Sequence, residues 1–224
     1  MKEKIIETNN LITTRQVCLD AIKNLKLIAL VGEPGYGKTT SLLNFVSKHP
    51  DFNVYYIKVR KSMTTRYFYS EILNIVSSES GINKGTVFTM INRIAFILNN
   101  TGKKNILIID EAGRLTKNQW HFIQEVRDET EKSTGMIIAG PEYFKSKLTE
   151  WRDKNVEGIP EVYRRINGWM HLKPPPKREI EAIVEAYNIK DIQFVEIALK
   201  VSNFGELKNL ILNYLISRDN DGNE

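Results

Sequence analysis

The chain has 224 residues, 42% of them hydrophobic, which is enough to bury a substantial core in one domain, and its net charge of +5 permits a polyanionic partner without requiring one. A single cysteine excludes an intramolecular disulfide and a cysteine zinc site, and the three scattered histidines lack the spacing of metal ligands or of a catalytic triad. Because no signal core or membrane-length apolar run is visible, we expect a cytoplasmic protein that does not enter a membrane.

An apolar run at residues 27–31 is followed by a glycine-rich loop and then by apolar residues at helical spacing. The loop reads Gly32-Glu33-Pro34-Gly35-Tyr36-Gly37-Lys38-Thr39, with Thr40 next in the helix. This is a complete G-x-x-x-x-G-K-[ST] phosphate loop in the strand–loop–helix context that the motif requires, which argues against a chance match. Its backbone N–H groups and the helix dipole favour phosphate, Lys38 is placed to reach the β- and γ-phosphates, and Thr39 to ligate Mg²⁺. The stretch is therefore predicted to bind a nucleoside triphosphate.

A cationic segment follows the second predicted strand, at residues 54–59, and leads into a helix. Its cations and hydroxyls are Lys58, Arg60, Lys61, Thr64, Thr65 and Arg66. These groups suit phosphate contacts that read no bases, and Lys84 in the loop at residues 83–86 offers one more. The alternative is a solvated basic turn capped by a threonine. If an oligomer repeats these contacts, they predict salt-sensitive binding to duplex DNA of any sequence.

A third apolar strand, at residues 105–109, ends in two carboxylates, Asp110 and Glu111. In phosphate-loop enzymes the first such carboxylate holds Mg²⁺, and the second is suited to orient or deprotonate the attacking water. The alternative is a solvated acidic turn, which the upstream phosphate loop disfavours. The Asp-Glu pair, together with the lack of an Asn-Lys-x-Asp segment that would read guanine, favours hydrolysis of ATP over GTP.

Two further strands are predicted, at residues 135–139 and, more weakly, at 169–172. Strands that alternate with helical patterns predict an α/β fold with a parallel sheet, flanked by helices on both faces. Pro174-Pro175-Pro176 interrupts this pattern, and three short amphipathic helices follow that cannot bury their apolar faces alone. We therefore predict a nucleotide-binding domain at residues 1–173 and a small helical lid at residues 174–224.

Three cations late in the chain are candidates for contacts with phosphate. Arg164 and Arg165 precede the fifth predicted strand, and either is placed to act as an arginine finger on the γ-phosphate of a neighbouring subunit. The alternative is an arginine pair that faces solvent. Lys208 lies near the start of a lid helix, where a basic residue can touch phosphate from above, although lysine is only a point charge.

In order and spacing, these motifs resemble those of the AAA+ ATPases, over roughly residues 11–215. The matching segments are the Walker A loop at 32–39, the Walker B strand at 106–111, the box VII arginines Arg164 and Arg165, and a sensor 2 segment at 205–208. Within that class, four stretches resemble the phage Mu B, TnsC and TniB group of transposition regulators. They are residues 11–16, 110–115, 122–128 and 136–144.

The resemblance implies a P-loop sheet of the ASCE/AAA+ type and an ATP- and Mg²⁺-dependent oligomer, a ring or a helical filament. It also implies duplex DNA and a transposase as partners, with the segment around Arg60 facing a central channel. Two departures are visible: sensor 1 falls near Gly140, and Lys208 stands where sensor 2 usually has arginine. A helicase loader or replication initiator of the DnaC/IstB kind shares the Asp-Glu Walker B and is the alternative. A signalling NTPase switch that never touches DNA is the third.

Overall fold

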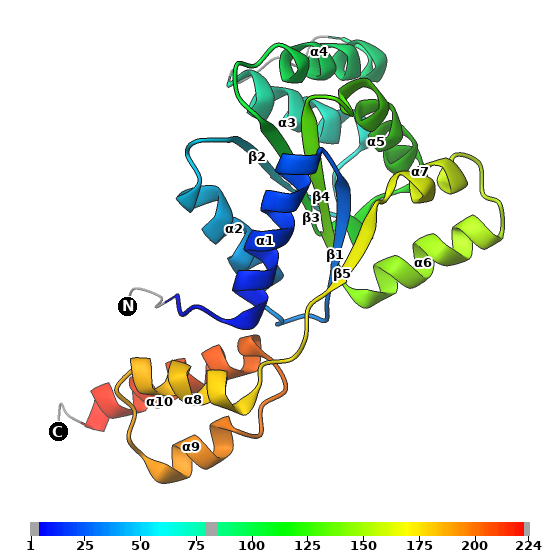
Figure 1. Cartoon of the computed structure of the whole chain (residues 1–224). Helices are drawn as coiled ribbons and strands as arrows, with labels where there is room; N and C mark the ends of the chain where they lie inside the picture. The colour runs from blue at the N-terminus through cyan, green and yellow to red at the C-terminus, as the bar shows by residue number, and fades with distance from the viewer. Residues whose placement is uncertain (1–4, 79–84, 222–224) are drawn as a thin grey trace.

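The structure of the protein is a computed structural model, and it describes residues 5–78 and 85–221. Its centre is a five-stranded parallel sheet, as predicted, with the strand order β2-β3-β4-β1-β5 (Figure 1). The strands are β1 (Leu27–Val31), β2 (Asn53–Lys58), β3 (Asn105–Asp110), β4 (Thr134–Gly140) and β5 (Gly168–His171). Because all five run the same way, the phosphate loop after β1 and the acidic pair after β3 lie at one edge of the sheet, on either side of the end of β4.

Helices cover both faces of this sheet. One face carries α1 (Asn9–Asn24) and α2 (Lys38–Lys48). The other carries α3 (Thr65–Ser77), α4 (Val87–Asn99), α5 (Lys117–Thr130), α6 (Glu142–Asp153) and α7 (Ile159–Arg165), and a short 3-10 turn, η1 (Ala112–Arg114), follows β3. Successive residues of β3 alternate between the two cores: Ile106 and Ile108 face α1 and α2, whereas Leu107 and Ile109 face the other layer. Burial on both sides explains why the strands are continuous apolar runs.

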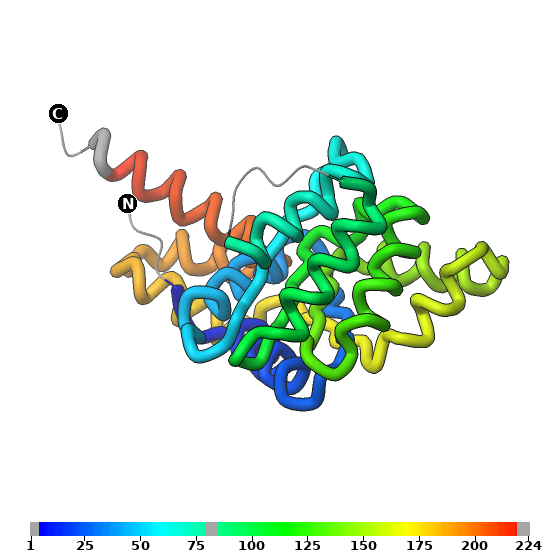
Figure 2. Tube along the Cα trace, turned by 90° about the horizontal axis from the view of Figure 1, so that it is seen from above, coloured from blue at the N-terminus to red at the C-terminus, as the bar shows by residue number. Residues whose placement is uncertain are grey.

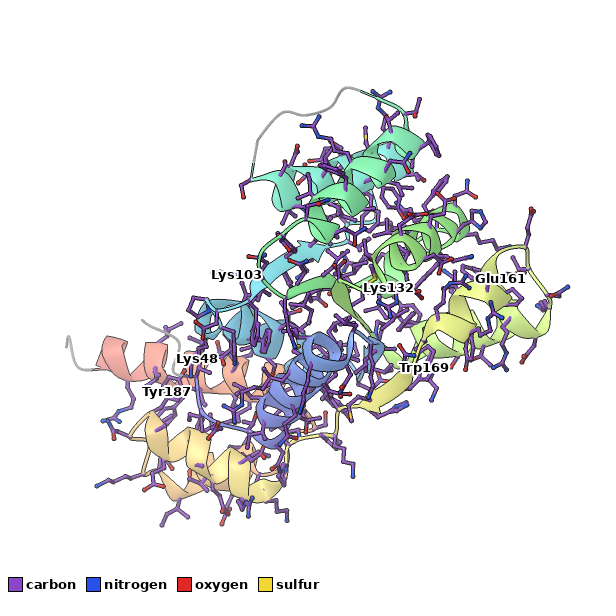
Figure 3. The ribbon with its side chains drawn as sticks, turned by 45° about the horizontal axis from the view of Figure 1, so that its top comes forward. Lys48, Lys103, Lys132, Glu161, Trp169 and Tyr187 are labelled. Carbon is purple, nitrogen blue, oxygen red and sulfur yellow. The ribbon has the colours of Figure 1, made fainter. Side chains whose placement is uncertain are left out.

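The edge strand β5 pairs with β1 along its whole length and is also packed by aromatic side chains. Trp169 lies beside α6 and α7 (Figure 3), with ring centroids 5.6 Å from those of both Phe144 and Tyr163. No β5 residue is fully buried, which accounts for the weak apolar signal of this strand in the sequence. β5 leads through the three prolines into the C-terminal helices.

Three helices form a separate unit after the prolines, α8 (Lys177–Ala186), α9 (Ile192–Ala198) and α10 (Phe204–Asp221). They share a core of their own, to which Ile180, Phe194 and Leu207 belong. In Figures 1 and 2 this unit lies at the end of the molecule where α1 begins, below the sheet in the first view. The division of the chain at residue 173 stays a prediction. In the part of the chain that the structure describes, no helix combines the length and apolarity needed to cross a membrane.

Candidate functional site

The phosphate loop has the backbone conformation that its glycines permit. Gly35 and Gly37 have φ values of +84° and +80°, in the left-handed region where a side chain causes strain. Gly37 is the N-cap of α2 and has no side chain, so the first N–H groups of α2 face the loop. The loop and the helix terminus together form a concave backbone surface suited to an anion.

Lys38 folds back over the loop, where its ammonium group donates to the carbonyls of Gly32 and Glu33. Burial lowers the pKa of Lys38, and the carboxylates of Asp110 and Glu111 raise it in part. The Lys38 ammonium group is partly desolvated, and it is stabilised more strongly by charged phosphate oxygens than by neutral carbonyls. It should therefore exchange its carbonyl contacts for phosphate when a nucleotide binds.

Thr39 and Asp110, which the sequence predicted as a metal-binding pair, are in contact. The Thr39 hydroxyl donates to Oδ2 of Asp110 at 2.7 Å, although the two residues come from α2 and β3. Asp110 is only 1% exposed, and its Oδ1 accepts the backbone N–H of Glu111 at 2.8 Å. A hydroxyl and a carboxylate are the oxygen ligands that Mg²⁺ prefers, so the residues fit this ion.

Asp110 has one further partner that sequence analysis missed. Tyr56 of β2 donates its phenol hydroxyl to the same Oδ2 atom at 2.9 Å. Burial, together with the nearby Asp110 carboxylate, raises the pKa of Tyr56 well above its usual range, so the phenol stays protonated. The only signal in the sequence is the position of Tyr56 near the end of an apolar strand, which does not show which strand lies beside it.

Glu111 has a left-handed backbone, with φ +61°, which is uncommon for a residue with a side chain. Such conformations cost about 1–3 kcal/mol and cluster at functional sites. The Glu111 carboxylate lies 3.4 Å from Nε of Arg114, a partner that the sequence analysis did not consider. Its side chain is 30% exposed and lines the same cavity as Lys38 and Thr39, where a general base for hydrolysis is needed.

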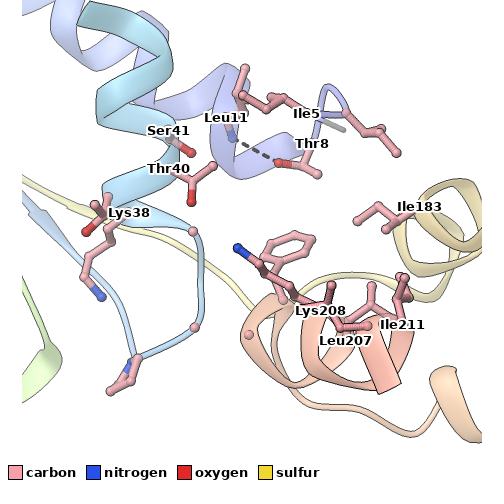
Figure 4. Close-up of a pocket in the computed structure, with 18 of the residues that line it drawn as sticks. Ile5, Thr8, Leu11, Lys38, Thr40, Ser41, Ile183, Leu207, Lys208 and Ile211 are labelled. Atoms are coloured by element: carbon pink, nitrogen blue, oxygen red, sulfur yellow. Dashed lines mark hydrogen bonds between the residues drawn. The ribbon is translucent and has the colours of Figure 1, made fainter. Parts of the chain in front are cut away.

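This cavity, of about 530 Å³, lies between the phosphate loop, the start of α1 and the lid (Figure 4). Its polar side holds Lys38, Thr39, Thr40 and Glu111. Its apolar side is formed by Ile5, Ile6, Leu11, Ile183, Tyr187, Leu207, Ile211 and Leu212. Figure 4 shows Lys208 extending from α10 toward the loop. A cavity that is polar beside the loop and apolar beyond it has room for the phosphates at one end and a base at the other.

The lid contacts the phosphate loop directly, through a backbone hydrogen bond that no sequence motif indicates. The backbone N–H of Phe204, at the start of α10, donates to the carbonyl of Gly35 at 3.0 Å. A Cβ atom on Gly35 would lie 2.3 Å from Oδ1 of Asn203, so this approach also requires glycine. The position of α10 is therefore coupled to the conformation of the loop.

The start of α1 joins the same junction. Asn10, which is 6% exposed, donates from Nδ2 to the carbonyls of Tyr36 and Lys173, and its Oδ1 accepts the N–H of Lys173. The preceding residue, Asn9, donates its backbone N–H to Oε1 of Glu179 in the lid at 2.8 Å. Asparagine is common in many surroundings, so its type alone gave no signal of this role.

The two candidate finger arginines differ in their surroundings. Arg165 pairs with Asp128 of α5, with one contact at 2.6 Å, and also donates to the carbonyl of Glu161. Its hydrogen bond to Asp128 raises the pKa of Arg165 further above its ordinary value. Arg164 is exposed at the end of α7. Both assignments stay predictions, and the geometry favours Arg164 as the side chain able to reach another molecule.

The candidate DNA segment lies beside the acidic pair. The N–H of Val59 donates to the carbonyl of Asp110 at 2.9 Å, so the turn after β2 adjoins the end of β3. Lys58, Arg60, Lys61 and Arg66 are exposed, and Thr65 is half-buried. The exposed Thr64 is the N-cap of α3 and accepts the N–H of Tyr67, which is the capping role considered as the alternative. Lys84 lies outside the described residues.

The predicted sensor 1 position brings only backbone to the site. Gly140 ends β4, and its carbonyl accepts the N–H of Gly32 at 3.2 Å. Just beyond it, Oε1 of Glu142 accepts from Nδ1 of His171 at 2.8 Å, a contact between α6 and β5. A water-positioning side chain at Gly140 itself is therefore excluded by residue type.

A parallel sheet with a phosphate loop after β1 and an Asp-Glu pair after β3 defines the fold of a P-loop NTPase. More narrowly, the chain belongs to the AAA domain family, because the sequence model of that family matches residues 22–148, more than half of its length. No curated protein sequence matches the chain.

Several solved structures share this fold at low sequence identity. ORC2 of Aeropyrum pernix, in ADPNP–ADP complexes, has a TM-score of 0.68 at 15% identity, over 94% of this chain and 61% of that one. ORC1 of the same organism, in complex with DNA, has a TM-score of 0.70 at 15% identity, over 96% and 62%. AMPPCP-bound DnaA of Aquifex aeolicus has a TM-score of 0.57 at 15% identity, over 91% of this chain and 61% of DnaA. These likenesses concern the fold alone, and the chain spans about three fifths of the length of these three proteins.

Proposed function

We propose that this chain is an oligomeric DNA-binding ATPase that hydrolyses ATP with Mg²⁺ and regulates DNA transposition by selecting target DNA and recruiting or activating a transposase. The observation that carries the ATPase part is the convergence of Lys38, Thr39 and Glu111 on one cavity beside the C-terminal helices, with Asp110 hydrogen-bonded to Thr39 directly behind it. The motif resemblance to the Mu B, TnsC and TniB group supports the transposition part.

In this proposal each residue of the site has one chemical role. The N–H groups at the start of α2 and the Lys38 ammonium bind the phosphates, and Lys208 approaches them from the lid. Thr39 and Asp110 would hold Mg²⁺, which neutralises charge that develops on the phosphates during transfer. Glu111 orients the attacking water and accepts its proton. The apolar side of the cavity takes the base and excludes water from it.

The DNA part of the proposal relies on the exposed cations after β2. Arg60 and Lys61 lie at the carboxyl edge of the sheet, beside the acidic pair rather than on a remote surface. Positive side chains without a base-reading element favour backbone contacts, so binding should tolerate any sequence and weaken steeply with salt. ORC1, a protein of this fold, has been solved in complex with DNA, which is consistent with the proposal.

A replication initiator or helicase loader is the second candidate, favoured by the similarity in fold to ORC1, ORC2 and DnaA. The two candidates differ in their expected DNA and partner. A transposition regulator should bind duplex DNA and respond to a transposase, whereas a helicase loader should prefer single strands and bind a helicase.

The experiment that tests the proposal measures the ATPase rate against protein concentration, with duplex DNA, single-stranded DNA or neither. We expect a rate that rises with both protein concentration and duplex DNA, with oligomers visible by electron microscopy, and Lys38→Ala as the control that lacks nucleotide binding. Monomers alone in the presence of ATP and duplex DNA would refute the assembly. Stimulation by single strands only would favour the second candidate.

A further inference from the structure

Tyr56 is a candidate functional residue that no motif indicates. In the register of β2 with β3, Tyr56 pairs with Ile108 and Lys58 pairs with Asp110. Side chains alternate along a strand, so Tyr56, Ile108 and Asp110 point to the same face of the sheet, the one covered by α1 and α2. From there the phenol reaches forward to Oδ2 of Asp110.

The Asp110 carboxylate is held by donors from α2, from β2 and from the turn that follows β3. Oδ2 accepts from the hydroxyls of Thr39 and Tyr56, at 2.7 and 2.9 Å, and Oδ1 accepts from the N–H of Glu111. A carboxylate that is 1% exposed needs such donors, because it has almost no contact with water and its oxygens would otherwise be buried without hydrogen bonds. Thr39 can donate its hydrogen to Asp110 while its oxygen lone pairs remain for a cation, whereas the phenol of Tyr56 serves only to fix the carboxylate.

We propose that Tyr56 is a positioning residue for the cation site: its hydroxyl holds Asp110 in the rotamer that presents this carboxylate, together with Thr39, to Mg²⁺ in the nucleotide complex. The inference rests on the proposed function only in so far as the chain binds nucleotide with Mg²⁺. It does not depend on hydrolysis, DNA or a transposase. Loss of the hydrogen-bond partner of a metal-binding group typically costs roughly 10–100-fold in metal affinity or activity.

The test is Tyr56→Phe, which removes one hydroxyl and keeps the ring that packs against the α1/α2 core. Binding of a fluorescent ATP analogue is titrated with Mg²⁺, and again in EDTA. We expect the Mg²⁺ concentration for half-maximal binding to rise about tenfold or more, with nucleotide affinity in EDTA unchanged. If Tyr56 has only a structural role, Tyr56→Phe should weaken nucleotide binding equally with Mg²⁺ and in EDTA, and this result would overturn the inference. A variant with the same Mg²⁺ dependence as the wild type would also overturn it.

Tyr55→Phe is the matched control, because Tyr55 is the preceding residue of β2 and packs on the opposite face of the sheet. It should leave the Mg²⁺ curve unchanged. In the background of Asp110→Asn, Tyr56→Phe should add no further shift, since its only route to the cation is through the carboxylate; an additive shift would contradict the inference. A wild-type chain that binds Mg²⁺–nucleotide without hydrolysing it would overturn the proposed ATPase and leave this test intact. A wild-type chain whose binding ignores Mg²⁺ would overturn both.

Discussion

Replacing Asn10 by alanine is expected to loosen the junction between the phosphate loop and the lid. The Asn10 amide makes three hydrogen bonds, one to the carbonyl of Tyr36 in the loop and two to the backbone of Lys173 in the connection to the lid. Each bond contributes a net of about 1 kcal/mol, so the loss is about 3 kcal/mol if water does not replace the amide. At 6% exposure, there is little room for such replacement.

The assay is thermal unfolding, followed by limited proteolysis with trypsin. For a chain of this size each kcal/mol lowers the unfolding midpoint by about 2–4 °C, so Asn10→Ala should lower it by roughly 6–12 °C. Trypsin should also cleave faster after Lys177 and Arg178, the exposed basic residues at the start of α8, because a released lid exposes that helix.

Asn9→Ala is the matched control for this prediction. Asn9 is exposed, and its contact with Glu179 is made by the backbone N–H, which alanine retains. If Asn10→Ala has the same unfolding midpoint and the same rate of tryptic cleavage as Asn9→Ala, the Asn10 amide does not hold the junction and the reasoning is wrong.

Three further predictions concern catalysis, assembly and DNA. Glu111→Gln should bind ATP as the wild type does but hydrolyse it at least roughly 100-fold more slowly, because an amide cannot accept the proton of water; equal loss of binding by filter assay would contradict this division of roles. Arg164→Ala should lower the ATPase rate by a factor on the order of 1,000, and only in the assembled state. Arg165→Ala should instead lower the unfolding midpoint, because the contact with Asp128 is lost. The opposite result would assign the arginine-finger role to Arg165. Arg60→Ala combined with Lys61→Ala should weaken duplex binding and reduce the slope of log affinity against log salt by about 2 per subunit, and an unchanged slope would exclude this segment.

The sheet and the chemical centre of the site could be predicted from the sequence because their signals are local. The β-branched run of β3 and the loop that ends at Lys38 and Thr39 each carry their meaning in consecutive residues. That Asp110 meets Thr39 also follows from general rules, since parallel strands bring the residues after their carboxyl ends to one edge. Strand ends differed by one or two residues, as between the predicted 54–59 and the observed Asn53–Lys58.

The contacts that the sequence could not predict join residues far apart along the chain. Tyr56 reaches Asp110 only because β2 lies beside β3, and Asn10 reaches Lys173 because the chain returns to α1 after β5. Arg165 is tied to Asp128 by the packing of α7 on α5, which no local pattern encodes. Each depends on strand order or helix packing, and a residue type such as tyrosine or asparagine fits too many surroundings to reveal it.

The composition of the cavity gives a physical reason to expect that a second subunit completes the site. Lys38 and Lys208 are the cations among the described residues that line it, and none of those lining residues is an arginine. Negative charge spread over the γ-phosphate oxygens during transfer is best stabilised by a guanidinium, whose contribution is about 10³–10⁵ in rate. Within its own chain, Arg165 is engaged by Asp128, and Arg164 is exposed in the last turn of α7. An exposed arginine on one subunit complements a nucleotide cavity that lacks an arginine on the neighbouring subunit. We therefore expect such a site to reach full activity only when the subunits assemble.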